Sequence, residues 1–415
     1  MNMYEVPEID SSSHSQLFFT VVSVDEAVAI VKKMAKQTES ETISIDIADG
    51  RVLAEPITTM EDIPGFDKSW KDGYACVASD TYVASESSPA ILSLIGSISM
   101  GKTMQQQINP GECVYVPTGG QIPIGADAVV MIEYAEVIGE KVLIHQPVVL
   151  RENIIAKDED FKKGTTIYSS GHTLRLQDIG VLASIGKPYA SVRKSPRVGI
   201  ISTGIELVPS EATPSIGEIR DVNSHLIATF LQRQGATAVK YGIIRDDHKE
   251  LMVVIEKASK ECDAVIISGG SSKDHNDVTL HAIASIGTIH VHGISIAPGK
   301  PTIIGECYDT PVIGLPGHPV STFMVMSLVV APLIEGMKGT PSKPISNKTC
   351  TIATDLKLEV GKAQYIRVKV ENEVATPILG KSGLLHTLIH SDGIIQLPSN
   401  KEGLVKGEKV EVRLW

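Results

Sequence analysis

The residues between positions 263 and 321 have types and spacings that suit the binding of an anion. Three apolar runs each end in a turn rich in Gly, Ser or Pro: Ala264–Ile267 before Ser268–Ser272, Ile294–Ala297 before Pro298–Pro301, and Val312–Leu315 before Pro316–Ser321. In open α/β sheets such turns lie at the carboxyl ends of the strands, where ligands bind. Small residues let backbone N–H groups approach a ligand, Lys300 adds charge, and a helix start at Pro319 adds free N–H groups. These features predict a site for a phosphate or another oxyanion.

Polar side chains follow other expected strands of the same region. Thr203 and Glu206 follow a strand at Arg197–Ser202, and Asp246 follows one at Ala238–Ile244. The intervening stretches have helical patterns, at residues 223–234, 249–261 and 277–286. Alternating strands and helices indicate right-handed βαβ units and a mostly parallel sheet, so these side chains should meet at one edge.

The 415 residues are too many for one core, and about two to four domains are expected. Short β-rich runs at 90–150 predict a small β domain. A second set of β-rich runs, from 349, predicts a β-barrel or sandwich, which a helix at 321–337 and a linker join to the α/β part. No GxGxxG or P-loop pattern occurs, so dinucleotide and Walker-type sites are rejected.

Composition excludes several classes of protein. A net charge of −11 without a basic stripe argues against a nucleic-acid or membrane-surface partner. The five cysteines are scattered and form no CxxC pair, which suits a reducing cytoplasm and gives no zinc site. The N-terminus does not have the pattern of a signal peptide, and the longest apolar run, Phe323–Ile334, is too short to span a bilayer. A soluble, cytoplasmic protein is expected.

Three charged positions have ordinary structural interpretations when only their own neighbourhoods are considered. Asp72 lies in a Pro/Gly-rich loop and reads as a turn residue that caps its own backbone. Asp160 belongs to a charged run that is typical of a solvated loop. Arg367 lies inside a strand and reads as a surface residue.

Ordered motifs along nearly the whole chain resemble those of the molybdopterin molybdenumtransferases, the MoeA family that includes the E domain of gephyrin. The segment SWKDGYA at 69–75 is similar to S-x-x-D-G-Y-A, and residues 117–133 are close to a family consensus. The other matches follow in family order: STGIEL at 202–207, DVN at 221–223, IIRDD at 243–247, ISGGSS at 267–272 with Asp277, PGKP at 298–301, LPGHPVS at 315–321 and QYIR at 364–367.

The resemblance implies an elongated homodimer of the α/β plus β class. The implied parts are a flexible tail at 1–19, a linking domain at 20–60 and 146–194, an inserted β domain at 61–145, a MogA-like α/β molybdopterin-binding domain at 195–340 and a C-terminal β-barrel at 341–415. The implied activity is that of a transferase of molybdenum cofactor biosynthesis. It inserts molybdate, or tungstate, into adenylylated molybdopterin with Mg²⁺-dependent release of AMP. A MogA-type adenylyltransferase is a candidate partner.

Residue roles follow from the same resemblance. The implied metal ligands are Asp246, Asp277 and Glu206, which suits the preference of Mg²⁺ for carboxylate and phosphate oxygens. Lys300 and Asp72 join the two aspartates as catalytic candidates, and Asp72 and Asp160 are expected to reach the site of the partner subunit. The expected binding residues are Thr203, Glu206, Asp221, Asn223, Ser268, Gly269, Gly270, Ser272, Pro301, Pro316, Gly317, Ser321, Arg367 and Asp160.

The chain departs from the family pattern at several of these motifs. Ala297 replaces the first Lys of K-P-G-K-P, His318 replaces the Asn of L-P-G-N-P, and Ile205 replaces an Asp. Leu384 stands where a family Ser is expected. A non-catalytic paralogue that binds molybdopterin or a partner therefore remains the alternative, and a MogA-type adenylyltransferase is a weaker one because the chain carries additional domains.

Overall fold

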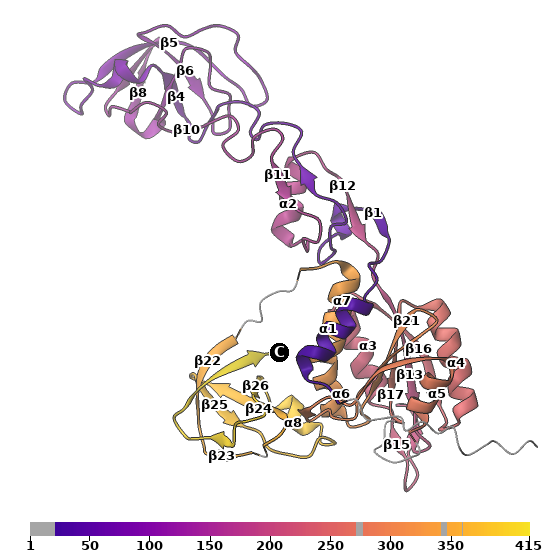
Figure 1. Ribbon diagram of the computed structural model, residues 1–415. Helices are drawn as coiled ribbons and strands as arrows, with labels where there is room; N and C mark the ends of the chain where they lie inside the picture. The colour runs from indigo at the N-terminus through magenta and orange to yellow at the C-terminus, as the bar shows by residue number, and fades with distance from the viewer. Residues whose placement is uncertain (1–20, 271–276, 342–346, 359) are drawn as a thin grey trace, which may run out of the picture.

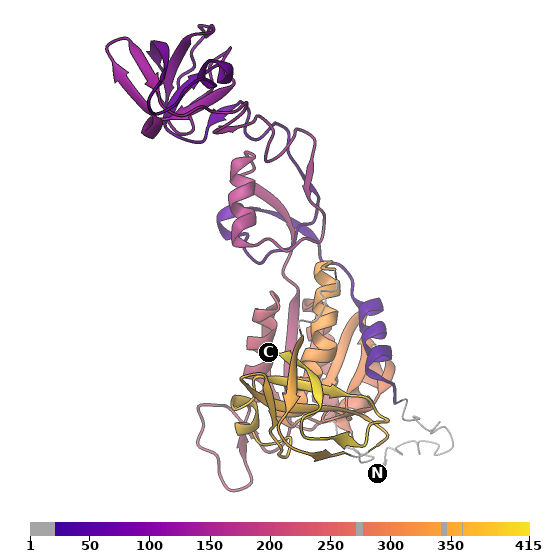
Figure 2. The same cartoon turned by 90° about the vertical axis from the view of Figure 1, so that its left-hand side faces the viewer.

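The computed structural model describes residues 21–270, 277–341, 347–358 and 360–415. Figures 1 and 2 show an elongated molecule with a β unit at one end and a narrow linking part in the middle. An α/β unit and a second β unit lie side by side at the other end.

The α/β unit is built on a six-stranded sheet. The strand order is β16 (Thr237–Ile244), β13 (Arg197–Thr203), β17 (Ala264–Ser268), β21 (Thr310–Leu315), β20 (Ile303–Cys307) and β18 (Gly287–His292). The first four strands are parallel and the last two are antiparallel. The mostly parallel sheet predicted from the sequence is confirmed.

Helices cover both faces of this sheet, which explains why β17 and β21 are mostly apolar and buried at every residue. One face packs against α1 (Val24–Met34), α3 (Asn223–Arg233) and the last helical run of the unit. The other face packs against α4 (His248–Glu261) and α5 (Val278–Ile286).

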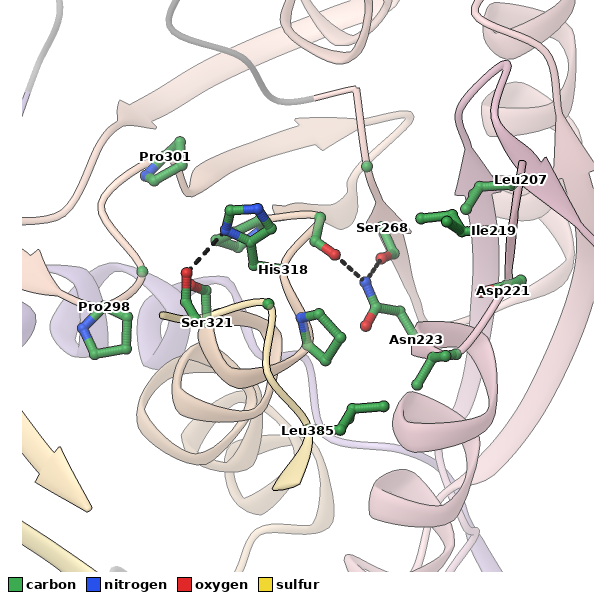
Figure 3. A pocket seen from close by; sticks show the side chains of 18 of the residues that line it. Leu207, Ile219, Asp221, Asn223, Ser268, Pro298, Pro301, His318, Ser321 and Leu385 are labelled. Carbon is green, nitrogen blue, oxygen red and sulfur yellow. Dashed lines mark hydrogen bonds between the residues drawn. The ribbon is translucent and has the colours of Figure 1, made fainter. Parts of the chain in front are cut away.

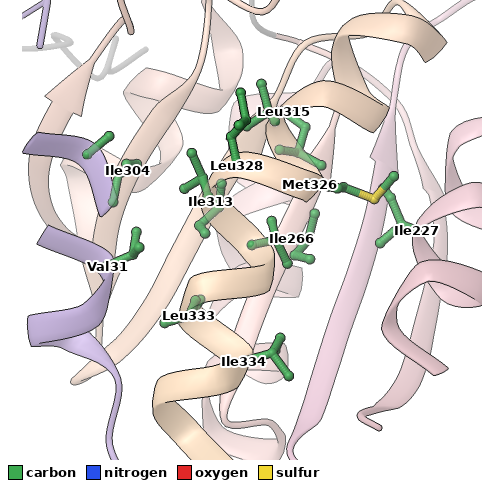
Figure 4. Packing of buried hydrophobic residues seen from close by; sticks show 14 of the residues in the cluster. Val31, Ile227, Ile266, Ile304, Ile313, Leu315, Met326, Leu328, Leu333 and Ile334 are labelled. Carbon is green, nitrogen blue, oxygen red and sulfur yellow. The ribbon is translucent and has the colours of Figure 1, made fainter. Parts of the chain in front are cut away.

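The last helical run consists of α6 (Pro319–Val325), a π-helical segment (Met326–Val330) and α7 (Ala331–Lys338). Pro332 lacks an N–H group and cannot donate to the carbonyl four residues earlier, and the π segment immediately before α7 accommodates that loss. By length and composition the run could cross a membrane, but 72% of it is buried inside the protein. Leu333 and Ile334 pack with Ile266 of the sheet (Figure 4), so its apolar character reflects a core position and no membrane protein is indicated.

One strand expected in this sheet lies elsewhere. Residues 294–297 were predicted to precede a third ligand-binding turn of the sheet, but β19 (Ile296–Ala297) pairs in parallel with β24 (Ala363–Glu371) of the neighbouring β unit. The position beside β21 is taken by β20, because these two strands form a tight hairpin. The chain leaves the sheet as a loop, in which Gly293 N–H donates to the Thr302 carbonyl at 2.8 Å.

The C-terminal unit is a closed five-stranded barrel, because β24 pairs with both β25 and β26. Its other strands are β22 (Asn347–Ile352), β25 (Val374–Pro377), β26 (Gly393–Leu397) and β28 (Lys409–Leu414), with the short elements β23 (Leu356–Lys357), β27 (Gly403–Leu404) and α8 (His386–Ile389) beside them. The expected fold class, α/β plus β with a C-terminal barrel, is confirmed.

The distal β unit contains a second six-stranded sheet. Its order is β7 (Ala128–Met131), β4 (Gly73–Cys76), β6 (Glu112–Val116), β5 (Ala90–Ser97), β9 (Lys141–Ile144) and β8 (Ala135–Ile138). The linking part contains α2 (Leu176–Ser184) and two strand pairs: β1 (Ser40–Ser44) with β12 (Tyr189–Arg193), and β2 (Ile57–Thr58) with β11 (Thr166–Tyr168). A further pair, β3 (Lys68–Ser69) with β10 (Ile154–Ile155), belongs to the distal β unit (Figure 1), where the Ser69 N–H donates to the Gly120 carbonyl at 2.8 Å.

A buried carboxylate organises the linking part. Asp178 of α2 has a side chain that is 1% exposed, and it accepts hydrogen bonds from Tyr168 Oη at 3.1 Å and from Arg175 Nη2 at 2.9 Å. His172 Nε2 lies 2.7 Å from its other oxygen. Burial alone would raise the pKa of Asp178, but the hydrogen bonds from Arg175, His172 and Tyr168 hold this pKa well below its ordinary value.

Replacing Asp178 with asparagine should destabilise the linking part by about 3 kcal/mol, because a buried and hydrogen-bonded charge is removed. The depressed pKa contributes stability above the unfolded-state pKa of about 4, and that stability is lost as the pH falls further. Hydrogen exchange of α2 should therefore accelerate below about pH 4 in the wild type, and this dependence should be absent in Asp178→Asn. Asp46→Asn is the control, because Asp46 is exposed and lies in the same part of the chain. Equal exchange of α2 in Asp178→Asn and Asp46→Asn would contradict the prediction.

Candidate active site

A cavity of about 1090 Å³ lies between the α/β unit and the barrel. Loops that follow β13, β17 and β21 form one side of it, together with the start of α3. The barrel contributes Lys362, Ser382, Gly383 and Leu385. The residues that were predicted from the sequence and line this cavity are Thr203, Glu206, Asp221, Asn223, Ser268, Gly269, Lys300, Pro301, Pro316, Gly317 and Ser321.

Asn223 connects three of the segments that surround the cavity. Its Nδ2 donates to Ser268 Oγ and to the Gly317 carbonyl, both at 2.8 Å (Figure 3). Because a carbonyl can only accept, these contacts fix the orientation of the amide. The side chain is 7% exposed, so it holds the start of α3 against the ends of β17 and β21.

Asp221 has a similar anchoring contact. Its Oδ2 accepts from Ser202 Oγ at 2.7 Å, and its Oδ1 accepts from the Ser224 N–H at 3.1 Å. The residue lines the cavity although it is 7% exposed. Its position ties the segment 204–222 to the end of β13.

Two glycines allow the loop after β17 to pass close to β13. Gly269 has φ +101°, and a Cβ there would lie 2.0 Å from the Thr203 carbonyl oxygen. Gly270 has φ +65°, and a Cβ there would lie 2.5 Å from Thr279 Oγ1. Gly269 lines the cavity, whereas Gly270 packs behind it. Ser272, also predicted for this loop, lies outside the described residues.

The three carboxylates expected to hold a metal occupy different positions. Glu206 lines the cavity, whereas Asp246 lies behind the strand end, where its Oδ1 accepts from Thr203 Oγ1 at 2.6 Å. Asp277 is the N-cap of α5 and accepts from the Leu280 N–H at 2.8 Å. It is 3% exposed, and burial raises its pKa to about 6.

Among the described residues, no three His, Cys, Asp or Glu side chains form a cluster that could hold a metal ion. The structure therefore does not assemble Glu206, Asp246 and Asp277 into one three-carboxylate site. A Mg²⁺ ion typically binds one or two carboxylates together with substrate phosphate oxygens. Glu206, in the wall of the cavity, fits that mode of binding.

The two aspartates expected to serve a partner subunit do not line the cavity of their own chain. Asp72 lies in the distal β unit, where its Oδ1 accepts from the N–H and Oγ1 of Thr118 at 2.6 and 2.8 Å. These hydrogen bonds lower the pKa of Asp72. Asp160 is exposed, and its N–H donates to the Ile63 carbonyl at 3.0 Å.

Arg367 is not the surface residue that its strand pattern suggested. It is 6% exposed, and burial lowers its pKa. Its Nη2 donates to the Gly380 carbonyl at 3.1 Å, and within the described residues its Nε has no partner. Arg367 does not line the cavity, but it holds the barrel loop 380–385 that does.

The family resemblance marked Leu384 in that barrel loop, but sequence reasoning assigned no role to Ser382. The Ser382 carbonyl accepts from the Val320 N–H at 3.0 Å, and Ser382 Oγ lies 2.8 Å from His318 Nδ1. The loop thereby closes the cavity over the first turn of α6. Lys362 and Arg220 also line the cavity and were not predicted. Periodicity gives no signal for these residues, since they lie in irregular segments or at strand ends, far in sequence from the strand ends that they face.

Three family models match the chain in order. The MoeA N-terminal region (domain I and II) matches residues 22–186, a probable molybdopterin binding domain matches 199–336, and the MoeA C-terminal region (domain IV) matches 349–415. The molybdopterin molybdenumtransferase of Bacillus subtilis is 30% identical over 407 residues, which cover 95% of this chain and 94% of that protein. A Methanocaldococcus jannaschii protein named for molybdopterin biosynthesis is 34% identical over 89% of this chain and 91% of its own length.

The chain belongs to the MoeA family. The structure of the MoeA protein of Pyrococcus horikoshii OT3 agrees with this assignment, with a TM-score of 0.84, 32% identity, and coverage of 95% of this chain and 100% of that one. As a MoeA protein the chain is a transferase of molybdenum cofactor biosynthesis. The cavity described above lies where its MoeA molybdopterin-binding and C-terminal regions meet.

Proposed function

We propose that this MoeA protein inserts molybdate or tungstate into adenylylated molybdopterin and releases AMP in a reaction that requires Mg²⁺. The observation that carries the proposal is the cavity between the α/β unit and the barrel. Backbone donors, carboxylates and lysines from separate segments line it, and such a set suits a phosphate, a divalent cation and a metal oxyanion together.

Within this proposal Glu206, in the wall of the cavity, would hold the cation together with phosphate oxygens of the substrate. A bound Mg²⁺ would neutralise the charge that develops on the leaving phosphate. Lys300, on the loop between β19 and β20, and the Ser321 side chain, in the first turn of α6, are suited to bind an oxyanion. Asp246 positions Thr203, whose hydroxyl donates to it, and Asp277 fixes the start of α5 as its N-cap.

We infer further that the active form is a cytoplasmic homodimer. Asp72 and Asp160 do not line the cavity of their own chain, and the elongated shape leaves the distal β unit free to approach a second subunit. Both aspartates would then close the cavity of the partner. A MogA-type adenylyltransferase is the proposed source of the adenylylated substrate.

Purified protein mixed with adenylylated molybdopterin, molybdate and Mg²⁺ tests the reaction, with released AMP measured by chromatography. AMP should appear only when all three components are present. The alternative, a non-catalytic paralogue, is motivated by Ala297, which lines the cavity at a position where the family has a lysine. Tight binding of molybdopterin without AMP release under any divalent cation would favour that alternative.

A further inference from the structure

We propose that Lys362 of the barrel supplies a second ammonium group to the oxyanion-binding wall of the cavity, beside Lys300. This inference rests on the proposed function and extends it to a residue for which the sequence motifs predict no role. The ligand that it would contact is an oxyanion, either the metal oxyanion or the nucleotide phosphate.

The charges around the cavity are divided between two walls. Glu206, Glu218 and Asp221 all come from the segment 204–222, which also contributes Arg220. The loop with Pro298 and Pro301 lies on the other side of the cavity from Asp221 and Ile219 (Figure 3), and Lys300 belongs to that loop. An anion is therefore repelled by the carboxylate wall and attracted to the lysine wall.

Strand pairing places Lys362 on this second wall. Ala297 of β19 is the register partner of Gln364 in β24. Lys362 directly precedes β24, and the Ala363 N–H donates to the Ser295 carbonyl at 3.1 Å, so Lys362 lies beside the segment that leads into Ala297. Both residues line the cavity. The flexible stem of Lys362 can carry its ammonium group over Ala297, whose methyl group contributes no charge.

The environment of Lys362 favours an electrostatic role. The residue is half-buried, whereas Lys357 of the same barrel is exposed and does not line the cavity. Charges that are partly withdrawn from water interact more strongly than exposed ones. The barrel would thus contribute directly to anion binding.

Equilibrium titration of the full chain with molybdate, tungstate and AMP, each alone at low salt, tests this assignment. Lys362→Met keeps the apolar stem and removes the charge, so the Kd for the bound oxyanion should rise about tenfold. Lys357→Met is the matched control and should change Kd less than twofold. An effect on molybdate and tungstate alone assigns Lys362 to the metal oxyanion, and an effect on AMP alone assigns it to the phosphate.

A charge-relocation variant tests the position. If Lys362 occupies the space above Ala297, then Ala297→Lys in the Lys362→Met background should recover most of the lost affinity. Unchanged binding of all three ligands by Lys362→Met would overturn the proposal, as would a wild type that binds none of them or a failure of Ala297→Lys to restore binding. These titrations require no turnover, so AMP release still tests the proposed function separately.

Discussion

Gly269→Ala is expected to destabilise the α/β unit by about 3 kcal/mol or more and to abolish AMP binding. The new Cβ would lie 2.0 Å from the Thr203 carbonyl oxygen, and φ at this position is +101°. Thr203 cannot move away easily, because β13 is paired in parallel with β16 on one side and β17 on the other. Thermal unfolding and AMP titration measure the two effects.

Gly217→Ala measures the destabilisation caused by backbone strain in the absence of a steric clash. Its φ is +96°, but a Cβ there meets nothing within 4 Å. This variant should cost only about 1 kcal/mol, the strain of an unfavourable backbone conformation. Equal stability of the two variants would show that the approach of Gly269 to Thr203 does not matter.

Glu206→Gln is expected to lower the rate of AMP release about 100-fold, because loss of a direct ligand should cost at least as much as loss of the groups that support metal ligands, which is typically about 10- to 100-fold. The substitution keeps the shape of the side chain and removes its charge. Glu206 is the one residue of the predicted metal set that lines the cavity. The Mg²⁺ concentration that gives half the maximal rate should also rise, which a purely structural defect would not cause.

Glu211→Gln is the control for this prediction, since Glu211 lies on the same segment, is exposed, and does not line the cavity. Its rate and Mg²⁺ dependence should match the wild type. If Glu206→Gln behaved in the same way as this control, the assignment of Glu206 to the metal would be wrong.

Most of the α/β unit could be predicted because its strands carry an unusually clear signal. Every residue of β17 and β21 is buried, and each strand is followed by small or polar residues where the chain turns. The pairing of β19 could not be predicted, because a short apolar run does not indicate which sheet will accept it. That choice depends on the β20–β21 hairpin and on a barrel strand more than sixty residues later.

Site residues at the ends of the parallel strands could be predicted from the sequence, whereas those that depend on side-chain direction or on docking of the barrel could not. Thr203, Ser268 and Gly317 lie at carboxyl ends of neighbouring strands or directly after them, and sheet geometry brings such positions together. Asp246 also follows a strand, but its side chain turns to Thr203 instead of the cavity, a choice that strand position does not determine. Lys362 and Ser382 enter only because the barrel docks on the α/β unit, and no local pattern encodes that docking.

The described residues bury their apolar side chains in several separate clusters, in the α/β unit, the barrel, the linking part and the distal sheet. The distal sheet joins the remainder of the molecule through only two crossings of the chain, near residues 60 and 165. Calorimetry should therefore record more than one melting transition, and a single midpoint would describe only the weakest cooperative unit. Ligands of the cavity should raise the transition of the α/β unit and barrel and leave that of the distal sheet unchanged.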